Sequence, residues 1–206
     1  MHRRRSIITA LVIAAALPFG AEAQDSCAAV ASNTSNVSRE ESDREAQGTI
    51  VEARRVSGDF EKCRTLGIAI HQTRSVTTAK LLFEAATALD GDFELAEILI
   101  ASAMRGLLEA RTADAYFAAT RTIESDFQKA RALAAALRAK PDDAAVVHGV
   151  LRTAPAVADD FQLASLLVAA ANAAPIRGTA RELYGAAART LQNQWEYRRA
   201  MHALSR

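Results

Sequence analysis

Residues 89–96 read Leu89-Asp90-Gly91-Asp92-Phe93-Glu94-Leu95-Ala96, and the Asp-Phe pair within them recurs along the chain. The other members of the series are Asp59-Phe60, Asp126-Phe127, Asp160-Phe161 and, in the same phase, Gln194-Trp195. Successive pairs are 33, 34, 34 and 34 residues apart. A period of this length is typical of stacked two-helix units. The sequence therefore predicts an all-α fold, a right-handed α-solenoid of about five antiparallel helix hairpins.

The residue before each pair is of a type that favours the N-terminus of a helix. These predicted helix caps are Gly58, Gly91, Ser125, Asp159 and Asn193. Each is followed three residues later by Glu or Gln, which is the spacing of a capping box. We therefore expect each pair to begin the second helix of its unit, with the aspartate close to the positive end of the helix dipole.

Three columns of side chains in these second helices predict a buried stripe. The first column is aromatic and consists of Phe60, Phe93, Phe127, Phe161 and Trp195. The second, three residues later, is Cys63, Ala96, Ala130, Ala164 and Arg198, and the third is Leu66, Leu99, Leu133, Leu167 and Met201. Because positions three and four apart lie on one helix face, we expect the aromatic column to form the repeat core with the other two. A surface on which a ligand stacks is the less favoured alternative for this column.

Prolines indicate where several of the helices end. Lys140-Pro141-Asp142 and Ala174-Pro175-Ile176 each follow a predicted second helix. Pro155 lies near the end of the first helix of the fourth unit, and we expect it to shorten or kink that helix.

The first 23 residues have the features of a secretory signal peptide. A basic segment at 2–5 precedes an apolar stretch at 7–19, and Ala21-Glu22-Ala23 fits a cleavage site. The apolar stretch is too short to span a bilayer, so an uncleaved anchor is the less favoured alternative. We predict cleavage near Ala23 and a periplasmic or secreted bacterial protein. A polar arm or capping segment is expected at 24–47, irregular over 24–37, and a helical repeat domain at 48–206.

The two cysteines, Cys27 and Cys63, both lie beyond the predicted signal peptide. In an exported protein such a pair commonly forms a disulfide. We therefore predict a structural disulfide that holds the N-terminal segment against the first unit. Two free buried thiols and a redox-active pair are the alternatives.

The chain has almost equal numbers of basic and acidic residues, so its net charge would not attract a polyanion. The whole chain has 25 basic and 24 acidic residues, and removing Arg3, Arg4, Arg5 and Glu22 with the signal leaves 22 and 23. Without a basic excess we expect no nucleic-acid binding. Because no other apolar run approaches membrane-spanning length, we also expect no stable membrane insertion after cleavage.

Residues with catalytic or metal-binding potential do not form a known motif. His71, His148 and His202 do not lie in a His-x-x-x-His pair. The sequence also lacks a zinc-type cysteine cluster, a nucleophile elbow and a phosphate-binding glycine loop. We therefore expect no catalytic residue, no metal and no cofactor.

The aspartate column allows two interpretations. In a stacked array Asp59, Asp92, Asp126 and Asp160 would line one edge, where an acidic row could bind a basic peptide or a cation. The favoured interpretation is that each carboxylate stabilises the first turn of its own helix.

Units of this kind resemble two types of helical repeat. The run 91–96 is distantly similar to the second helix of tetratricopeptide and HEAT-like α-solenoids, although the Trp and Leu-Gly-Tyr positions of a tetratricopeptide first helix are missing. The stretches 123–131 and 89–96 more closely resemble short bacterial repeats with a Ser-Asp-Phe/Tyr pattern. Those repeats occur beyond the protease part of BlaR-type membrane metallopeptidases and in exported proteins. The resemblance covers residues 48–204 and implies a repeat fold, and no active-site residue carries over because the His-Glu-x-x-His helix is absent.

The sequence thus favours an exported, non-catalytic module that binds an unknown protein or peptide of the cell envelope. Helical repeats present extended surfaces that suit such partners. The alternatives are a cell-envelope hydrolase with a site assembled across repeats, and a structural or stress-related envelope protein.

Overall fold

The structure, a computed structural model, describes residues 22–205, with side chains from residue 38 onward. The chain divides into two compact units, residues 1–37 and 38–206. Most of the predicted signal peptide, residues 1–21, lies outside the described residues. The prediction of an irregular arm at 24–37 is wrong, because helix α1 runs from Glu22 to Arg55. No proline or glycine between residues 22 and 47 interrupts it.

Residues 38–205 are helical apart from short connections, and no strand occurs within the described chain. After α1 the α-helices are α2 (Asp59–Gln72), α3 (Val76–Ala86), α4 (Asp92–Met104), α5 (Ala113–Thr122), α6 (Asp126–Ala139), α7 (Ala144–Thr153), α8 (Asp160–Ala173), α9 (Thr179–Ala188) and α10 (Gln194–Leu204). A short 3₁₀ helix, η1 (Ala154–Ala156), follows α7.

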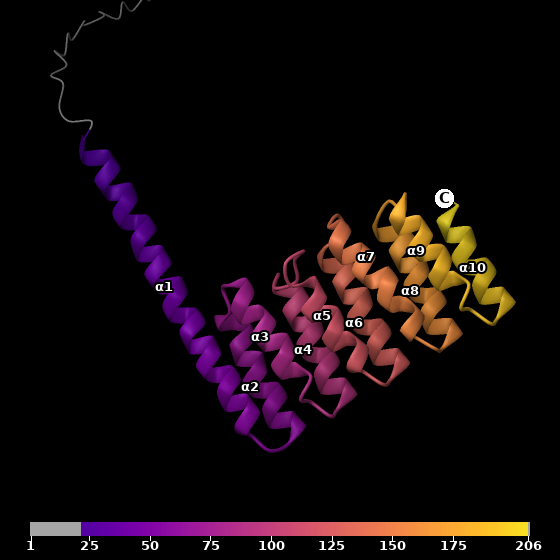
Figure 1. Ribbon diagram of the computed structural model, residues 1–206, viewed down its shortest axis with the longest axis horizontal. Coiled ribbons are helices and arrows are strands. Elements are labelled where there is room, and N and C mark those ends of the chain that lie inside the picture. Colours follow the sequence, from indigo (N-terminus) through magenta and orange to yellow (C-terminus); the bar gives the residue numbers. More distant parts are fainter. Residues whose placement is uncertain (1–21, 206) are drawn as a thin grey trace, which may run out of the picture. The chain divides into compact units, whose positions relative to one another are not determined.

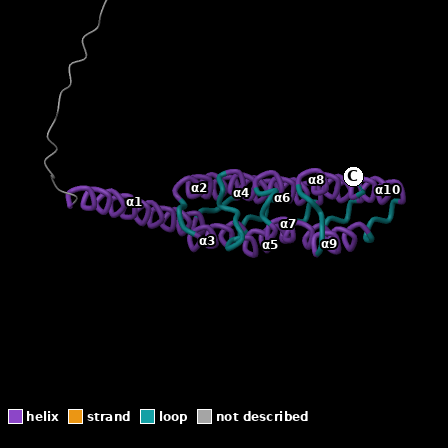
Figure 2. Tube along the Cα trace, turned by 90° about the horizontal axis from the view of Figure 1, so that it is seen from above, coloured by secondary structure: helices purple, strands orange, loops and turns teal. Residues whose placement is uncertain are grey.

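These helices form a two-layered array that follows the order of the sequence (Figure 1). The even-numbered helices make one layer, and α3, α5, α7 and α9 make the other (Figure 2). Within a layer each helix packs against the helix two places along the chain, and helices that are adjacent in the sequence, such as α2 and α3 or α5 and α6, pack across the layers. In the first unit, Ile50 and Ala53 of α1 belong to the common core. The predicted array of helix hairpins is therefore confirmed.

The predicted starts of the second helices are confirmed at all five positions. α2, α4, α6, α8 and α10 begin directly after Gly58, Gly91, Ser125, Asp159 and Asn193. Where the cap has a side chain, it accepts backbone hydrogen bonds from the first turn. The Asp159 carboxylate, for example, lies 2.8 Å from the Gln162 nitrogen. Gly58 adopts φ = 96°, a left-handed conformation that favours glycine.

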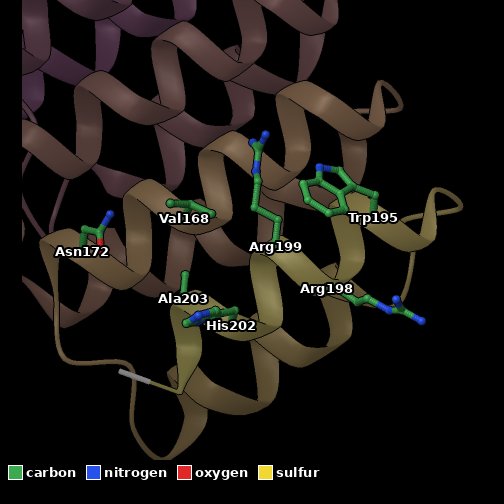
Figure 3. A pocket seen from close by; sticks show the side chains of 7 residues that line it. All are labelled: Val168, Asn172, Trp195, Arg198, Arg199, His202 and Ala203. Atoms are coloured by element: carbon green, nitrogen blue, oxygen red, sulfur yellow. The ribbon is translucent and has the colours of Figure 1, made fainter.

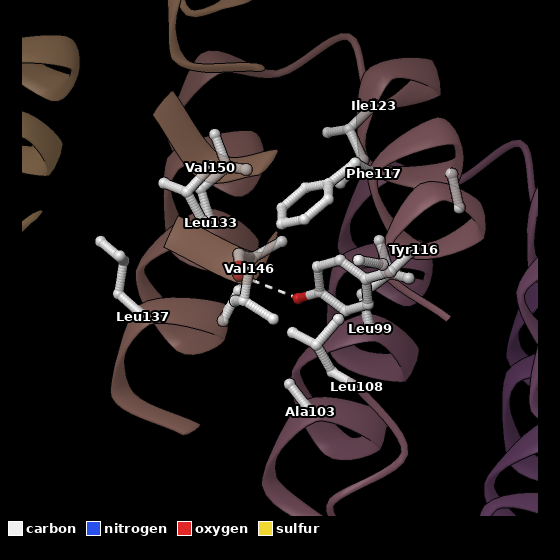
Figure 4. Packing of buried hydrophobic residues seen from close by; sticks show 14 of the residues in the cluster. Leu99, Ala103, Leu108, Tyr116, Phe117, Ile123, Leu133, Leu137, Val146 and Val150 are labelled. Carbon is white, nitrogen blue, oxygen red and sulfur yellow. Dashed lines mark hydrogen bonds between the residues drawn. The ribbon is translucent and has the colours of Figure 1, made fainter. Parts of the chain in front are cut away.

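The core contains the predicted small and large aliphatic columns. Leu66, Leu99, Leu133 and Leu167 are all buried, as are Ala96, Ala130 and Ala164. Tyr116 lies at the centre of the array, where its hydroxyl donates a hydrogen bond to the Ala132 carbonyl oxygen at 2.9 Å (Figure 4). Tyr184 makes the same contact with the Ala200 carbonyl oxygen at 2.7 Å. Burial raises the pKa of Tyr184 to about 12, so this hydroxyl stays protonated and able to donate.

Close packing in the other layer depends on a glycine. A Cβ atom at Gly149 in α7 would overlap the buried ring of Phe117 in α5. Pro155 has the predicted effect on the same unit, because α7 ends at Thr153 and the chain continues as η1.

The aromatic column does not belong to the core, and its predicted burial is wrong. The exposed fractions are 72% for Phe60, 55% for Phe93, 55% for Phe127, 56% for Phe161 and 73% for Trp195. The small and large columns three and six residues later are buried as predicted, except that Cys63 and Met201 are half-buried and Arg198 is exposed.

Helix geometry explains the outward direction of the rings. Three residues cover about 300°, so each step of three falls about 60° short of a full turn. Leu99 therefore lies about 120° around α4 from Phe93. The buried arc of α4 also includes Leu95 and Ile98, which move its centre still further from the ring. The aromatic side chain is left on the opposite, outward side of the helix.

Substitutions in α6 test this arrangement. We expect Phe127→Ala to change the free energy of unfolding by less than about 1 kcal/mol, because the ring is already largely in water. Leu133→Ala, six residues further on, should destabilise by about 2–5 kcal/mol because it opens a cavity in the core. Urea denaturation followed by circular dichroism measures both. Comparable losses from the two variants would contradict the outward placement of the ring.

Candidate functional site

The outward side of the even-numbered helices carries two columns of side chains, which we together call the aromatic face. The first is the exposed series Phe60, Phe93, Phe127, Phe161 and Trp195. The second, four residues later, is Arg64, Glu97, Arg131, Ser165 and Arg199. Positions four apart differ by only about 40° around the helix, so both columns point the same way. Ile68 and Met104 extend the exposed apolar surface beside them.

Arginines of the second column connect neighbouring units across the face. Nη2 of Arg131 in α6 lies 2.7 Å from Oε1 of Glu97 in α4. Nη2 of Arg199 in α10 donates to the Ser165 hydroxyl of α8 at 2.5 Å. The Arg131 guanidinium also lies 5.9 Å from the ring centre of Phe127, and that of Arg199 lies 5.1 Å from the ring centre of Phe161. These cation–π contacts hold the arginines alongside the exposed rings.

Two grooves lie between the helices on this side of the layer. One, of about 350 Å³, spans α4, α6 and α8, and its lining includes Ile100, Arg131, Arg138 and Ser165. The other, of about 360 Å³, lies between α8 and α10. It is lined by Val168, Asn172, Trp195, Arg198, Arg199, His202 and Ala203 (Figure 3). Both grooves combine apolar side chains with arginines.

The aspartate column performs a task that neither interpretation of the sequence included. Each carboxylate accepts a hydrogen bond from the cap of the next unit. Oδ2 of Asp92 lies 2.6 Å from the Ser125 nitrogen, and Oδ1 of Asp92 lies 2.9 Å from the Glu124 nitrogen. The equivalent bonds run from Gly91 to Asp59 at 2.6 Å, from Asp159 to Asp126 at 2.8 Å, and from Asn193 to Asp160 at 2.6 Å.

This series, which we call the inter-unit carboxylate bonds, changes the interpretation of the acidic row. The carboxylates are occupied by backbone amides 32 or 33 residues away. They still lie at the start of their own helices, where the helix dipole favours negative charge. Their role in the array is to connect consecutive units.

Two lysines reinforce these connections. Lys129 is buried, and its Nζ donates to the Ala156 carbonyl oxygen of the next unit at 2.9 Å, with a carboxylate oxygen of Asp126 at 3.8 Å. Lys62 does the same in the first unit, donating to the Ala88 carbonyl oxygen at 3.1 Å. Each lysine stands three residues after an aspartate of the column. In α2 and α6, both the aspartate carboxylate and the lysine ammonium group therefore bind the backbone of the next unit.

Cys63 is a free thiol in the structure. Its Sγ lies 3.8 Å from the Glu94 carbonyl oxygen, and burial together with the nearby Glu94 and Glu97 carboxylates raises its pKa. A raised pKa leaves less thiolate at neutral pH, which is the opposite of a reactive thiol. The side chain of Cys27 lies outside the described residues, so the disulfide between the two stays a prediction.

The histidines lie on three different helices, His71 on α2, His148 on α7 and His202 on α10. Among the described residues no group of His, Cys, Asp and Glu could hold a metal ion. Of the three histidines, only His202 lines a groove of the aromatic face. No helix in the described part of the chain is long and apolar enough to cross a membrane.

Comparison with protein-family models, curated proteins and solved structures gives no match for this chain. The grooves and the arginines within them were not predicted. The available signal was the spacing of four residues between an aromatic side chain and the following arginine in the first, third and fifth units.

Because of the inter-unit carboxylate bonds, we expect substitutions of Asp92 and of nearby Asp90 to have different effects on the free energy of unfolding. Asp92→Ala should destabilise the protein by about 1.5–3 kcal/mol, because two backbone amides of the next unit lose a charged acceptor. Asp90→Ala, at an exposed position two residues away, should stay within about 0.5 kcal/mol. Thermal and urea denaturation measure both. Equal effects would show that the carboxylate contributes no more than surface charge.

Proposed function

We propose that this protein is an exported helical-repeat module that binds another protein or a peptide through the aromatic face. The observation that carries the proposal is the series of five aromatic side chains, one in each unit, that are more than half exposed on one side of the array. Recurrent exposed apolar groups with polar neighbours are typical of interaction surfaces. Aromatic residues and arginine also provide much of the binding energy at protein interfaces.

The rings have no evident task in packing. The core between the even-numbered helices is filled by the buried alanines and leucines that follow each ring. Exposing five large aromatic side chains forgoes the hydrophobic stabilisation that their burial would give. A bound partner that covers the rings would recover this hydrophobic stabilisation. Partner binding therefore explains why each unit has an exposed ring.

Export is part of the proposal and rests on the signal-like residues 1–23. The resemblance to short bacterial Ser-Asp-Phe/Tyr repeats, which occur in exported proteins, agrees with it. We propose that the module has no catalytic activity. The partner is therefore expected to be a protein or peptide of the cell envelope.

Site-specific photo-crosslinking in the native host tests the proposal. A photoreactive phenylalanine analogue at Phe127 lies on the aromatic face, and the same analogue at Arg121 in α5 lies in the other layer. We expect a crosslinked partner of defined mass at position 127 and none at position 121. The identified partner should then form a stoichiometric complex with the purified protein.

The double variant Phe127→Ala/Phe161→Ala provides the specific control. Because both rings are exposed, the variant should fold normally and bind the partner at least tenfold more weakly, with each lost ring contributing about 1 kcal/mol or more. Unchanged affinity in a folded variant, or equal crosslinking from both layers, would contradict binding through the aromatic face.

A further inference from the structure

We infer that the segment bound across α6, α8 and α10 is an acidic peptide that also carries apolar side chains. This inference rests on the proposed function and specifies the chemistry of the partner. It is based on the charges and side chains that line the two grooves of the aromatic face.

The groove linings contain four arginines and no carboxylate. Arg131 and Arg138 line the groove over α4, α6 and α8, and Arg198 and Arg199 line the groove between α8 and α10. Arg131 and Arg199 have acidic partners at the edges, Glu97 and the largely buried Glu196. Within the described residues Arg138 and Arg198 have no ion pair, and both are exposed.

The outward side chains of α8, between these two basic regions, carry no charge of their own. The outward residues of α8 are Phe161, Ser165, Val168 and Asn172. Trp195 of α10 lines the groove between α8 and α10 and is exposed on the same side of the layer (Figure 3). A segment that crosses α8 would therefore place apolar side chains against Phe161, Val168 and Trp195, and carboxylates near the arginines on either side. Such complementarity of charge favours acidic partners and excludes basic ones.

A peptide fits this surface better than a nucleic acid or an anionic membrane. The ends of α6 and α8 beside the rings carry Asp126, Asp159 and Asp160, which would repel a continuous row of phosphates. The whole chain, with 25 basic and 24 acidic residues, also lacks the excess charge that binding a polyanion requires. A short peptide can place its few carboxylates at the arginines and avoid these aspartates.

Selection from a random peptide library tests the inference. Dodecamers displayed on phage are selected on the purified full chain and, in parallel, on the variant Arg138→Gln/Arg198→Gln. We expect the sequences recovered on the unmodified chain to be enriched in Asp and Glu together with apolar residues, and this enrichment to be lost on the variant. A matched variant, Arg121→Gln/Arg152→Gln, changes two exposed arginines of the other layer and should keep it.

The single tryptophan of the chain, Trp195, reports binding directly. Addition of the most enriched peptide should shift its fluorescence, with an affinity that falls as salt is raised and falls about tenfold in Arg138→Gln/Arg198→Gln. The same peptide with Gln in place of every Asp and Glu should bind about tenfold more weakly. A single-stranded oligonucleotide and vesicles of anionic lipid should produce no shift.

The outcomes separate the two proposals. Recovery of neutral or basic peptides, or equal binding of the glutamine peptide, overturns the acidic chemistry but leaves peptide binding in place. Fluorescence shifts with the oligonucleotide or the vesicles alone also overturn it. Recovery of no peptide, combined with no partner crosslinked at position 127, contradicts the proposed function itself.

Discussion

The array depends on one repeated interaction, the hydrogen bonds between an aspartate carboxylate and the backbone amides that cap the next unit's second helix. A helix N-terminus leaves amides without partners, and a carboxylate satisfies them while also meeting the positive end of the dipole. A hydrogen bond of this kind, involving a charged group, contributes about 1.5–3 kcal/mol. Because the acceptor stands at a fixed place in each unit, the bonds also fix the register between consecutive units. The nearly constant spacing of 33 or 34 residues between Asp-Phe pairs places the acceptor of each unit in this register.

The Asp-Phe pair therefore combines two tasks in adjacent residues. The aspartate connects its unit to the next one, and the phenylalanine is turned outward by about 100° along the same first turn. Every carboxylate bond thus places another ring at the same height on the aromatic face. The arginines one turn later lie beside those rings and across the joints between units, as Arg199 does between α10 and α8. The spacing of the exposed rings and the cohesion of the array follow from the same short motif.

The sequence was sufficient for local features and insufficient for orientation and long-range contacts. The caps, the helix starts and the effect of Pro155 depend on neighbouring residues, and all were predicted. The direction of Phe93 was not, because steps of three residues were treated as one face although they drift by about 60° each. The buried positions Leu95 and Ile98 contained the information needed to correct this. The acceptor role of Asp92 involves amides 32 and 33 residues away, which no local pattern specifies.

Amide hydrogen exchange measured by NMR tests the central interaction most directly. The Ser125 amide donates to Asp92, whereas the Phe127 amide, in the first turn of the same helix, has no acceptor among the described residues. First-turn amides without partners normally exchange rapidly. We expect the Ser125 amide to exchange much more slowly than the Phe127 amide and to lose this protection in Asp92→Ala. Equal, rapid exchange of the two amides in the unmodified protein would contradict this expectation.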